Sequence, residues 1–247
     1  MKPCWKLAPA HKISAMDQTS SSGPMVDAKL PPSAYGPEDI ARHYRNFDVS
    51  QGRYRFIDLE IPSGAKVLEV GCFLGHYCQY FQARGLEVTG VDISPEVIRE
   101  GQKLYPKLDL RCVGEVWPMD LQDGRYDVVI ASEVIEHVLH PNDFLKNLKR
   151  ALKPSGRLLL TTQNSNAIHY RLRMLLGRFR WDPTHLRLYS RPELEKELEL
   201  GGFELVKAVG IPINPKGPQK WPRLLAYWAA RCHANFCWTW GMVARPK

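Results

Sequence analysis

The sequence of 247 residues predicts an α/β fold with a doubly wound, mostly parallel sheet. Short apolar runs alternate with segments of helical period between residues 66 and 210. Glycine, serine, proline or aspartate bounds most of them, as expected for turns and helix ends. Such alternation predicts parallel strands joined by right-handed crossover helices. Ligands of these folds bind at the carboxyl ends of the strands.

The strands are predicted from the apolar runs. The first run, KVLEV, is ended by Gly71, which predicts a buried strand. In chain order the strands are expected at 66–70, 87–93, 109–113, 126–132, 157–163 and 203–210.

The helices are predicted from cap residues and apolar period. Ser94 is the expected N-cap of the second crossover helix, with Pro95 at its first position, and Ser190 is the expected N-cap of the last helix. The helices are expected at 77–84, 94–106, 141–156 and 190–203, with one or two more within 36–59.

The composition predicts a disordered arm at residues 1–34 and a single domain at residues 35–247. The arm is rich in Ser, Pro, Gly and Lys and lacks an apolar period. The six cysteines form no C-x-x-C pair or zinc-ligand spacing, which is typical of reduced thiols in a cytoplasmic protein. No secretory signal and no apolar run of about 18 residues is present, so no spanning helix is predicted.

The net charge of +8 is unevenly distributed. Residues 205–247 carry seven Lys/Arg and no acid, and residues 165–181 carry four Arg and no acid, so the rest of the chain is net negative. The positive segments are either ordinary solvated surface or a surface for acidic substrates, nucleic acid or anionic lipid.

The loop EVGCFLGHY follows the first strand. Gly71 stands where the backbone passes close to a ligand, and Gly75 precedes the helix. The dinucleotide fingerprint G-x-G-x-x-G and the GK[ST] phosphate loop are both absent, and Phe73 stands where another glycine might fall. The loop suits a ligand without phosphate at this point, although a glycine turn that binds nothing is the alternative.

Two acidic residues follow the next two strands. Asp92 ends the second strand and can accept both hydroxyls of a ribose; the alternative is a helix cap, for which Ser94 is already available. Glu115 follows the third strand and can accept a hydrogen bond from an adenine amino group; the alternative is a surface glutamate.

The fourth strand leads into SEVIEHVLHP, where Glu133, Glu136 and His137 cluster. Glu133 and His137 are four residues apart and are expected on one helical face. A metal site would need a third ligand, and E-x-x-E-H matches no zinc pattern, so no metal is predicted. A hydrogen-bonded structural histidine is the alternative to a catalytic one.

These motifs together resemble class I S-adenosylmethionine-dependent methyltransferases. The segments VLEVGCFLGHY, VTGVDIS, YDVVIASEVIEHV and LKRALKPSGRLLLTT occur in the family's order over residues 64–209, and WTWGMVARP resembles the family's last strand. The resemblance is to the type 11/type 23 methyltransferase-domain group, including ubiquinone-biosynthesis O-methyltransferases. It implies a Rossmann-like, seven-stranded sheet whose final strand is antiparallel. Similar segments also occur in methyltransferases resembling enzymes of surface-polysaccharide pathways.

The resemblance also implies roles for individual residues. Glu69, Gly71 and Gly75 would line the methionine end of S-adenosyl-L-methionine, with Cys72 keeping the common G-C pair. The remaining positions are Asp92 at the ribose, Ile93 at the adenine ring, Glu115 near the adenine amino group, and the backbone of Ala131 and Ser132 at the methionine moiety. Phe73 departs from the family, which often has glycine or a small residue there.

The implied reaction is methyl transfer to a small-molecule acceptor, a hydroxyl oxygen of a lipid-like quinol or phenol, or of a sugar. His137 is the first candidate for a general base, followed by His185 and Glu136. Substrate-side insertions are expected at about 164–189 and 215–236, where apolar stripes lie beside arginines. They form either a lid or a peripheral contact with an anionic membrane surface.

Other classes of protein remain alternatives. A nicotinamide dehydrogenase would require the missing G-x-G-x-x-G. A nucleic-acid methyltransferase would be expected to show an N-P-P-Y-like motif, where this chain has TTQNSNAI, so nucleic acid is not the expected partner. A methyltransferase acting on protein and a non-catalytic partner subunit stay open, as does the oligomeric state.

Overall fold

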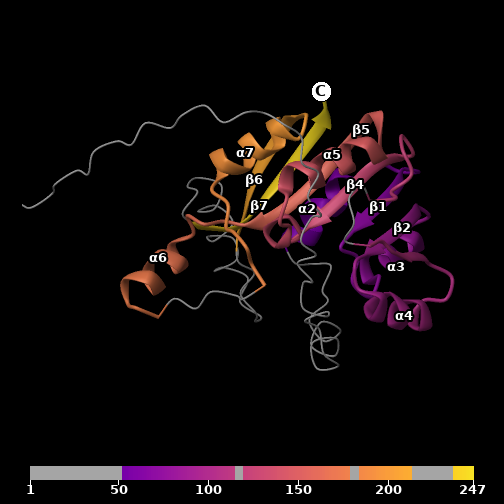
Figure 1. Cartoon of the computed structure of the whole chain (residues 1–247), viewed down its shortest axis with the longest axis horizontal. Coiled ribbons are helices and arrows are strands. Elements are labelled where there is room, and N and C mark those ends of the chain that lie inside the picture. The colour runs from indigo at the N-terminus through magenta and orange to yellow at the C-terminus, as the bar shows by residue number, and fades with distance from the viewer. Residues whose placement is uncertain (1–51, 115–118, 179–183, 213–235) are drawn as a thin grey trace, which may run out of the picture. The chain divides into compact units, whose positions relative to one another are not determined.

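A computed structural model describes residues 52–114, 119–178, 184–212 and 236–247. These residues contain a seven-stranded sheet with the strand order β3-β2-β1-β4-β5-β7-β6 (Figure 1). Its strands are β1 (Lys66–Val70), β2 (Glu87–Asp92), β3 (Asp109–Cys112), β4 (Tyr126–Ser132), β5 (Leu152–Gln163), β6 (Phe203–Pro212) and β7 (Cys237–Pro246). The predicted fold class, a Rossmann-like, mostly parallel sheet, is confirmed.

The pairing directions also agree with the prediction. The pairs β1–β2, β2–β3, β1–β4 and β4–β5 are parallel, whereas β7 is antiparallel to both of its neighbours, β5 and β6. The order of the strands reverses around β1, which places the carboxyl ends of β1, β2 and β4 side by side. In such sheets the reversal point is where ligands bind.

Helices cover both faces of the sheet. They are α2 (Gly52–Glu60), α3 (His76–Ala83), α4 (Pro95–Leu104), the 3₁₀ helix η1 (Ile135–His137), α5 (Pro141–Ala151), α6 (Ile168–Leu175) and α7 (Arg191–Leu200). Side chains of α5 and α7 join one buried cluster, and those of α2, α3 and α4 join the other. The strands contribute alternate residues to the two clusters, as the pleat requires. Val67 belongs to the second cluster and Leu68 to the first.

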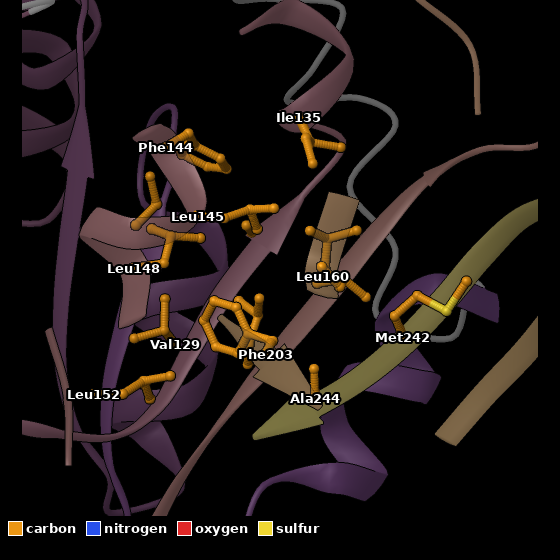
Figure 2. Packing of buried hydrophobic residues seen from close by; sticks show 14 of the residues in the cluster. Val129, Ile135, Phe144, Leu145, Leu148, Leu152, Leu160, Phe203, Met242 and Ala244 are labelled. Carbon is orange, nitrogen blue, oxygen red and sulfur yellow. The ribbon is translucent and has the colours of Figure 1, made fainter. Parts of the chain in front are cut away.

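Figure 2 shows the first of these clusters, where α5 lies on the sheet. Phe144, Leu145 and Leu148 of α5 meet Val129 of β4 and Phe203 of β6, and all five are at most 1% exposed. Burial of this much apolar surface is the main stabilising contribution to the fold, at about 1.5–3 kcal/mol for each large side chain.

Both predicted N-caps are confirmed. The Ser94 hydroxyl accepts a hydrogen bond from the Val97 amide at 3.3 Å. Ser190 and Glu193 form a capping box, in which the Glu193 carboxylate accepts from the Ser190 amide at 2.7 Å. Each helix therefore begins where the sequence indicates, because a side chain satisfies an amide that has no partner within the helix.

The helix expected at 141–156 is too long, since α5 ends at Ala151. Pro154 has no amide hydrogen, and its ring disfavours helical backbone at Lys153. Residues 152–156 instead extend β5, and Leu152 pairs with Tyr126. Strand β5 ends near Asn164, whose buried side chain donates to the Cys237 carbonyl at 2.9 Å and accepts from the Trp240 indole at 3.1 Å.

Several predictions lie outside the described residues. They are the arm at 1–34, the part of the first helical region before residue 52, Glu115, and all but the last residue of the insertion expected at about 215–236. Among the helices that the structure describes, none combines the length and apolar character needed to cross a membrane.

Candidate functional site

The loop between β1 and α3 turns sharply over the end of β2. The amides of Gly71 and Cys72 both donate to the Val91 carbonyl, at 2.9 and 3.0 Å. Gly71 and Gly75 have φ of 74° and 80°, and Phe73, between them, has φ of 51°. Phe73 thus adopts the left-handed conformation that a glycine adopts without strain, at a cost of about 1–2 kcal/mol.

Asp92 organises this loop from the end of β2. One carboxylate oxygen accepts from the Phe73 amide and the other from the Ser94 amide, both at 3.0 Å. The two oxygens together still offer lone-pair capacity to a ligand. Burial raises the pKa of this carboxyl, and hydrogen bonds from the Ser94, Phe73 and Ile93 amides act in the opposite direction. The adjacent Ile93 side chain is 51% exposed, which leaves an apolar surface beside the carboxylate.

Glu69 lies deeper, on the face of β1 that carries the second buried cluster. Only 3% of it is exposed, and it accepts a hydrogen bond from the Cys78 thiol of α3 at 2.9 Å. Burial raises the pKa of its carboxyl to about 8, while the thiol acts in the opposite direction. Cys72 is buried close by.

Glu69 makes stability depend on pH. A glutamate normally titrates near 4.5, so between that pH and about 8 the folded state binds a proton that the unfolded state has lost. Stability therefore falls as pH rises through this window. Glu69→Gln stays neutral, and its stability relative to the native chain should improve by roughly 2–4 kcal/mol between pH 5 and pH 8.5.

Urea titrations at several pH values would measure this effect. Glu204→Gln, at an exposed glutamate paired with Arg245, is the matched control and should leave the pH profile unchanged. Parallel profiles for Glu69→Gln and the native chain would contradict the prediction.

Gly71 is required for two separable reasons. Its φ is 74°, and a Cβ added there would lie 2.6 Å from Cγ2 of Val134. Gly64 has nearly the same φ, 72°, with nothing within 4 Å of an added Cβ. We expect Gly64→Ala to cost about 1–2 kcal/mol of stability from the backbone alone, and Gly71→Ala to cost a further 1–3 kcal/mol or so from the clash.

Denaturant titration would measure both costs. In a Val134→Ala background most of the additional cost at Gly71 should disappear, because the clashing methyl group is gone. Equal costs at the two glycines would show that contact with Val134 does not constrain the loop.

The end of β4 carries a chain of polar side chains. The Ser132 and Thr161 hydroxyls lie 2.9 Å apart, and the Thr161 hydroxyl donates to Glu133 at 3.1 Å. Thr161 has one hydroxyl hydrogen, so Ser132 donates to Thr161. Glu133 has φ of 56°, a conformation that costs energy in a residue with a side chain and that is concentrated at functional sites.

The expectation that Glu133 and His137 lie on one helical face is wrong. Glu133 has a left-handed backbone conformation, and the helix that follows it, η1, has only three residues. Residues four positions apart therefore do not share a helical face in this turn. Instead the turn buries Glu136 completely. One of its oxygens accepts from the Thr162 hydroxyl at 2.9 Å. Burial and then Glu133 raise the pKa of the Glu136 carboxyl to about 8.

His185 reaches the same place from a distant part of the chain. Nδ1 of His137 lies 2.8 Å from the Thr184 carbonyl, and the Leu186 amide donates to the Glu136 carbonyl at 2.8 Å. The rings of His137 and His185 have centroids 4.7 Å apart. The structure therefore brings Glu136, His137 and His185 together. One carboxylate oxygen and one nitrogen from each ring lie within 4.8 Å of one another.

Other predicted residues gather at the neighbouring strand ends. Asp92 is the last residue of β2 and Ile93 follows it, the glycine loop follows β1, and half-buried Ser132 is the last residue of β4, next to fully buried Ala131. This arrangement fits S-adenosylmethionine, since a carboxylate with free lone pairs, an exposed apolar side chain and a tight glycine turn meet at one edge. When bound, this cofactor supplies a methyl group already activated by a positively charged sulfur.

Sequence reasoning missed the supporting residues. Thr161 and Thr162 are fully buried on β5 and hold Glu133 and Glu136. Two hydroxyl side chains at the end of an otherwise apolar strand were the available signal. Cys78 was another, because it stands one helical turn inside α3, under the glycine loop.

The fold and site together define a class of protein, and comparison with known proteins agrees. The family described as "Methyltransferase domain" matches residues 41–208. The chain therefore belongs to this family, and its cofactor is S-adenosylmethionine. A solved S-adenosylmethionine-dependent methyltransferase from Archaeoglobus fulgidus shares the fold, with a TM-score of 0.61 at 17% identity over 85% of this chain and 100% of that one.

The curated relatives are more specific. A ubiquinone biosynthesis O-methyltransferase of Nitrobacter winogradskyi is 31% identical over 173 residues, 64% of this chain and 64% of that protein. Another, from Bradyrhizobium sp. strain ORS 278, is 31% identical over 223 residues, 86% of this chain and 78% of that protein. Across several such relatives the chain spans just under two thirds of their length.

Proposed function

We propose that the chain methylates a hydroxyl oxygen of a small, lipid-like quinol or phenol. The observation that carries the proposal is the group formed by Glu136, His137 and His185 just after β4, next to the strand ends that carry the residues expected to bind the cofactor. O-methylation needs a group that takes or weakens the hydroxyl proton, because a neutral hydroxyl is a poor nucleophile.

His137 is suited to this role. If its Nδ1 donates to the Thr184 carbonyl, the neutral ring keeps a lone pair on Nε2. The acceptor oxygen would lose its proton to Nε2. S-adenosylmethionine, held by the residues at the ends of β1 and β2, would supply the methyl group to that oxygen and leave as S-adenosylhomocysteine. The relatives' printed name supports a quinone-like acceptor over a sugar.

The test is methyl transfer from labelled S-adenosylmethionine to three probes, an alkyl-substituted catechol, a simple phenol and a monosaccharide. We expect a labelled methyl ether of the catechol, with turnover reduced at least tenfold in His137→Ala and unchanged in His140→Ala. His140 is exposed and only three residues away. Binding of S-adenosylhomocysteine without transfer to any hydroxyl would reject the acceptor class and favour a non-catalytic role.

The helix α6 supports a peripheral membrane contact for such an acceptor. None of its residues is buried, and its apolar side chains are unusually exposed. They are Ile168 at 41%, Leu172 at 51%, Met174 at 52% and Leu175 at 82%, followed by Leu176 at 65%. Arg171 and Arg173 lie among them, and residues 165–181 contain no acid. A short amphipathic helix of this composition suits an anionic interface.

Vesicle flotation would measure this contact. We expect the chain to float with phosphatidylcholine vesicles containing phosphatidylserine and to float much less with phosphatidylcholine alone. Leu175→Glu should abolish flotation, whereas Leu59→Glu, at a 71% exposed leucine of α2, should not. Equal flotation of the two variants would assign the interaction to another surface.

A further inference from the structure

Two exposed leucines flank the group of Glu136, His137 and His185. Leu139 stands two residues after His137 and is 56% exposed, and Leu186 directly follows His185 and is 45% exposed. Proteins commonly expose single leucines, so exposure alone indicates nothing. These two differ because each lies on one of the two segments that supply the imidazoles.

Hydrogen bonds hold these two segments together. The Leu186 amide donates to the Glu136 carbonyl at 2.8 Å, and Nη2 of Arg187 donates to the Leu139 carbonyl at 3.1 Å. The two leucines therefore lie on adjoining segments, although 47 positions separate them in the chain. Together they form an apolar border beside the polar group.

Other apolar residues of the same segments belong to the core. Ile135 is fully buried, and Val138 packs partly buried against the first cluster. Tyr189, three residues after Leu186, is 3% exposed and belongs to that cluster. Each segment thus combines apolar residues that the core covers with one leucine that stays accessible. Apolar side chains around a few convergent polar groups are the usual lining of a small-molecule site.

We propose that Leu139 and Leu186 bind the apolar tail of the acceptor and so select tailed acceptors over short ones. The proposed function, on which this inference rests, places the acceptor hydroxyl at Nε2 of His137. A tail carried by that acceptor passes the two leucines where it leaves the polar group. Each methylene that they shield from water favours binding. The two leucines determine specificity and are not catalytic, because neither carries a group that moves a proton.

The test is calorimetric binding of 4-methylcatechol and 4-hexylcatechol to the full chain saturated with S-adenosylhomocysteine. We expect the native chain to bind the hexyl compound at least tenfold more tightly than the methyl compound. In the double variant Leu139→Ser/Leu186→Ser this preference should fall below threefold. Leu200→Ser should keep it, since Leu200 is 53% exposed and ends α7 just before the start of β6. The single variants serve if the double variant is unfolded.

Three results would overturn the inference. One is a native chain that binds both catechols equally, and another is a double variant that keeps the native preference. The third is an equal loss of affinity for both catechols in the double variant, which would mean that the leucines only support the turn. If the double variant kept the preference but floated less with anionic vesicles, the leucines would belong to a membrane contact instead.

Methyl transfer from labelled S-adenosylmethionine to the same two catechols tests the proposed function separately. A chain that methylates both catechols but binds them equally would overturn the role of the leucines alone. A chain that shows the preference, and its loss in the double variant, but methylates neither compound would reject the proposed function and retain the leucines as the site of the tail.

Discussion

Asp92→Ala is expected to weaken S-adenosylhomocysteine binding about a hundredfold to ten-thousandfold. Two ribose hydroxyls would lose a charged acceptor, and each such hydrogen bond contributes about 1.5–3 kcal/mol. The same substitution leaves the Phe73 and Ser94 amides without the carboxylate that holds them at 3.0 Å. The substitution therefore removes two things at once: the carboxylate that holds the loop between β1 and α3, and the hydrogen-bond acceptor for the cofactor's ribose.

Calorimetry would measure the loss, and two variants sharpen it. Asp92→Asn retains one oxygen acceptor and should lose less affinity than Asp92→Ala. Asp143→Ala removes an exposed carboxylate from α5 and should bind like the native chain. If Asp92→Ala bound S-adenosylhomocysteine within threefold of the native chain, the end of β2 would not be the ribose site.

Phe144→Ala should have the largest effect on stability, a loss of about 3–5 kcal/mol. Phe144 is 1% exposed, and Figure 2 shows it among the residues packed between α5 and the sheet. Truncation removes the apolar ring from the core and leaves a cavity that α5 can close only in part. Since domains are stable by about 5–15 kcal/mol, this one change takes a large share of the total.

Urea titration with a common slope would measure the loss. Leu59→Ala removes a leucine side chain that is 71% exposed and should change stability by no more than about 0.5 kcal/mol. A loss under 1 kcal/mol for Phe144→Ala would mean that the α5 face of the sheet is loosely packed.

The fold was predictable because its signals are local. Ser94 and Ser190 mark helix starts through side chains that satisfy nearby amides, and Gly71 ends β1 through its backbone conformation. The antiparallel direction of β7 was predicted only through the resemblance, since an apolar run carries no sign of direction. The predicted end of the helix at 141–156 was wrong. The apolar period continues past Ala151, but Pro154 is incompatible with a helix there.

The positions of Asp92 and Gly71 at the ends of strands were predictable, because the apolar runs before them mark those ends. The relation of Glu136 to His185 was not, because 49 positions separate them in the chain and only the folded turn brings them together. Periodicity also misled, since it placed Glu133 and His137 on a helix that the left-handed backbone at Glu133 prevents.

Strand β7 has a consequence for how the sheet is assembled. It follows the other six strands in the chain, yet lies between β5 and β6. Strands β1 to β5 can pair as they emerge, but β6 pairs only with β7 in the described sheet. The Asn164 side chain likewise can form its hydrogen bonds to Cys237 and Trp240 only after β7 is in place. Such distant contacts form slowly, so the part of the sheet formed by β1 to β5 should fold early and the part formed by β6 and β7 should form last.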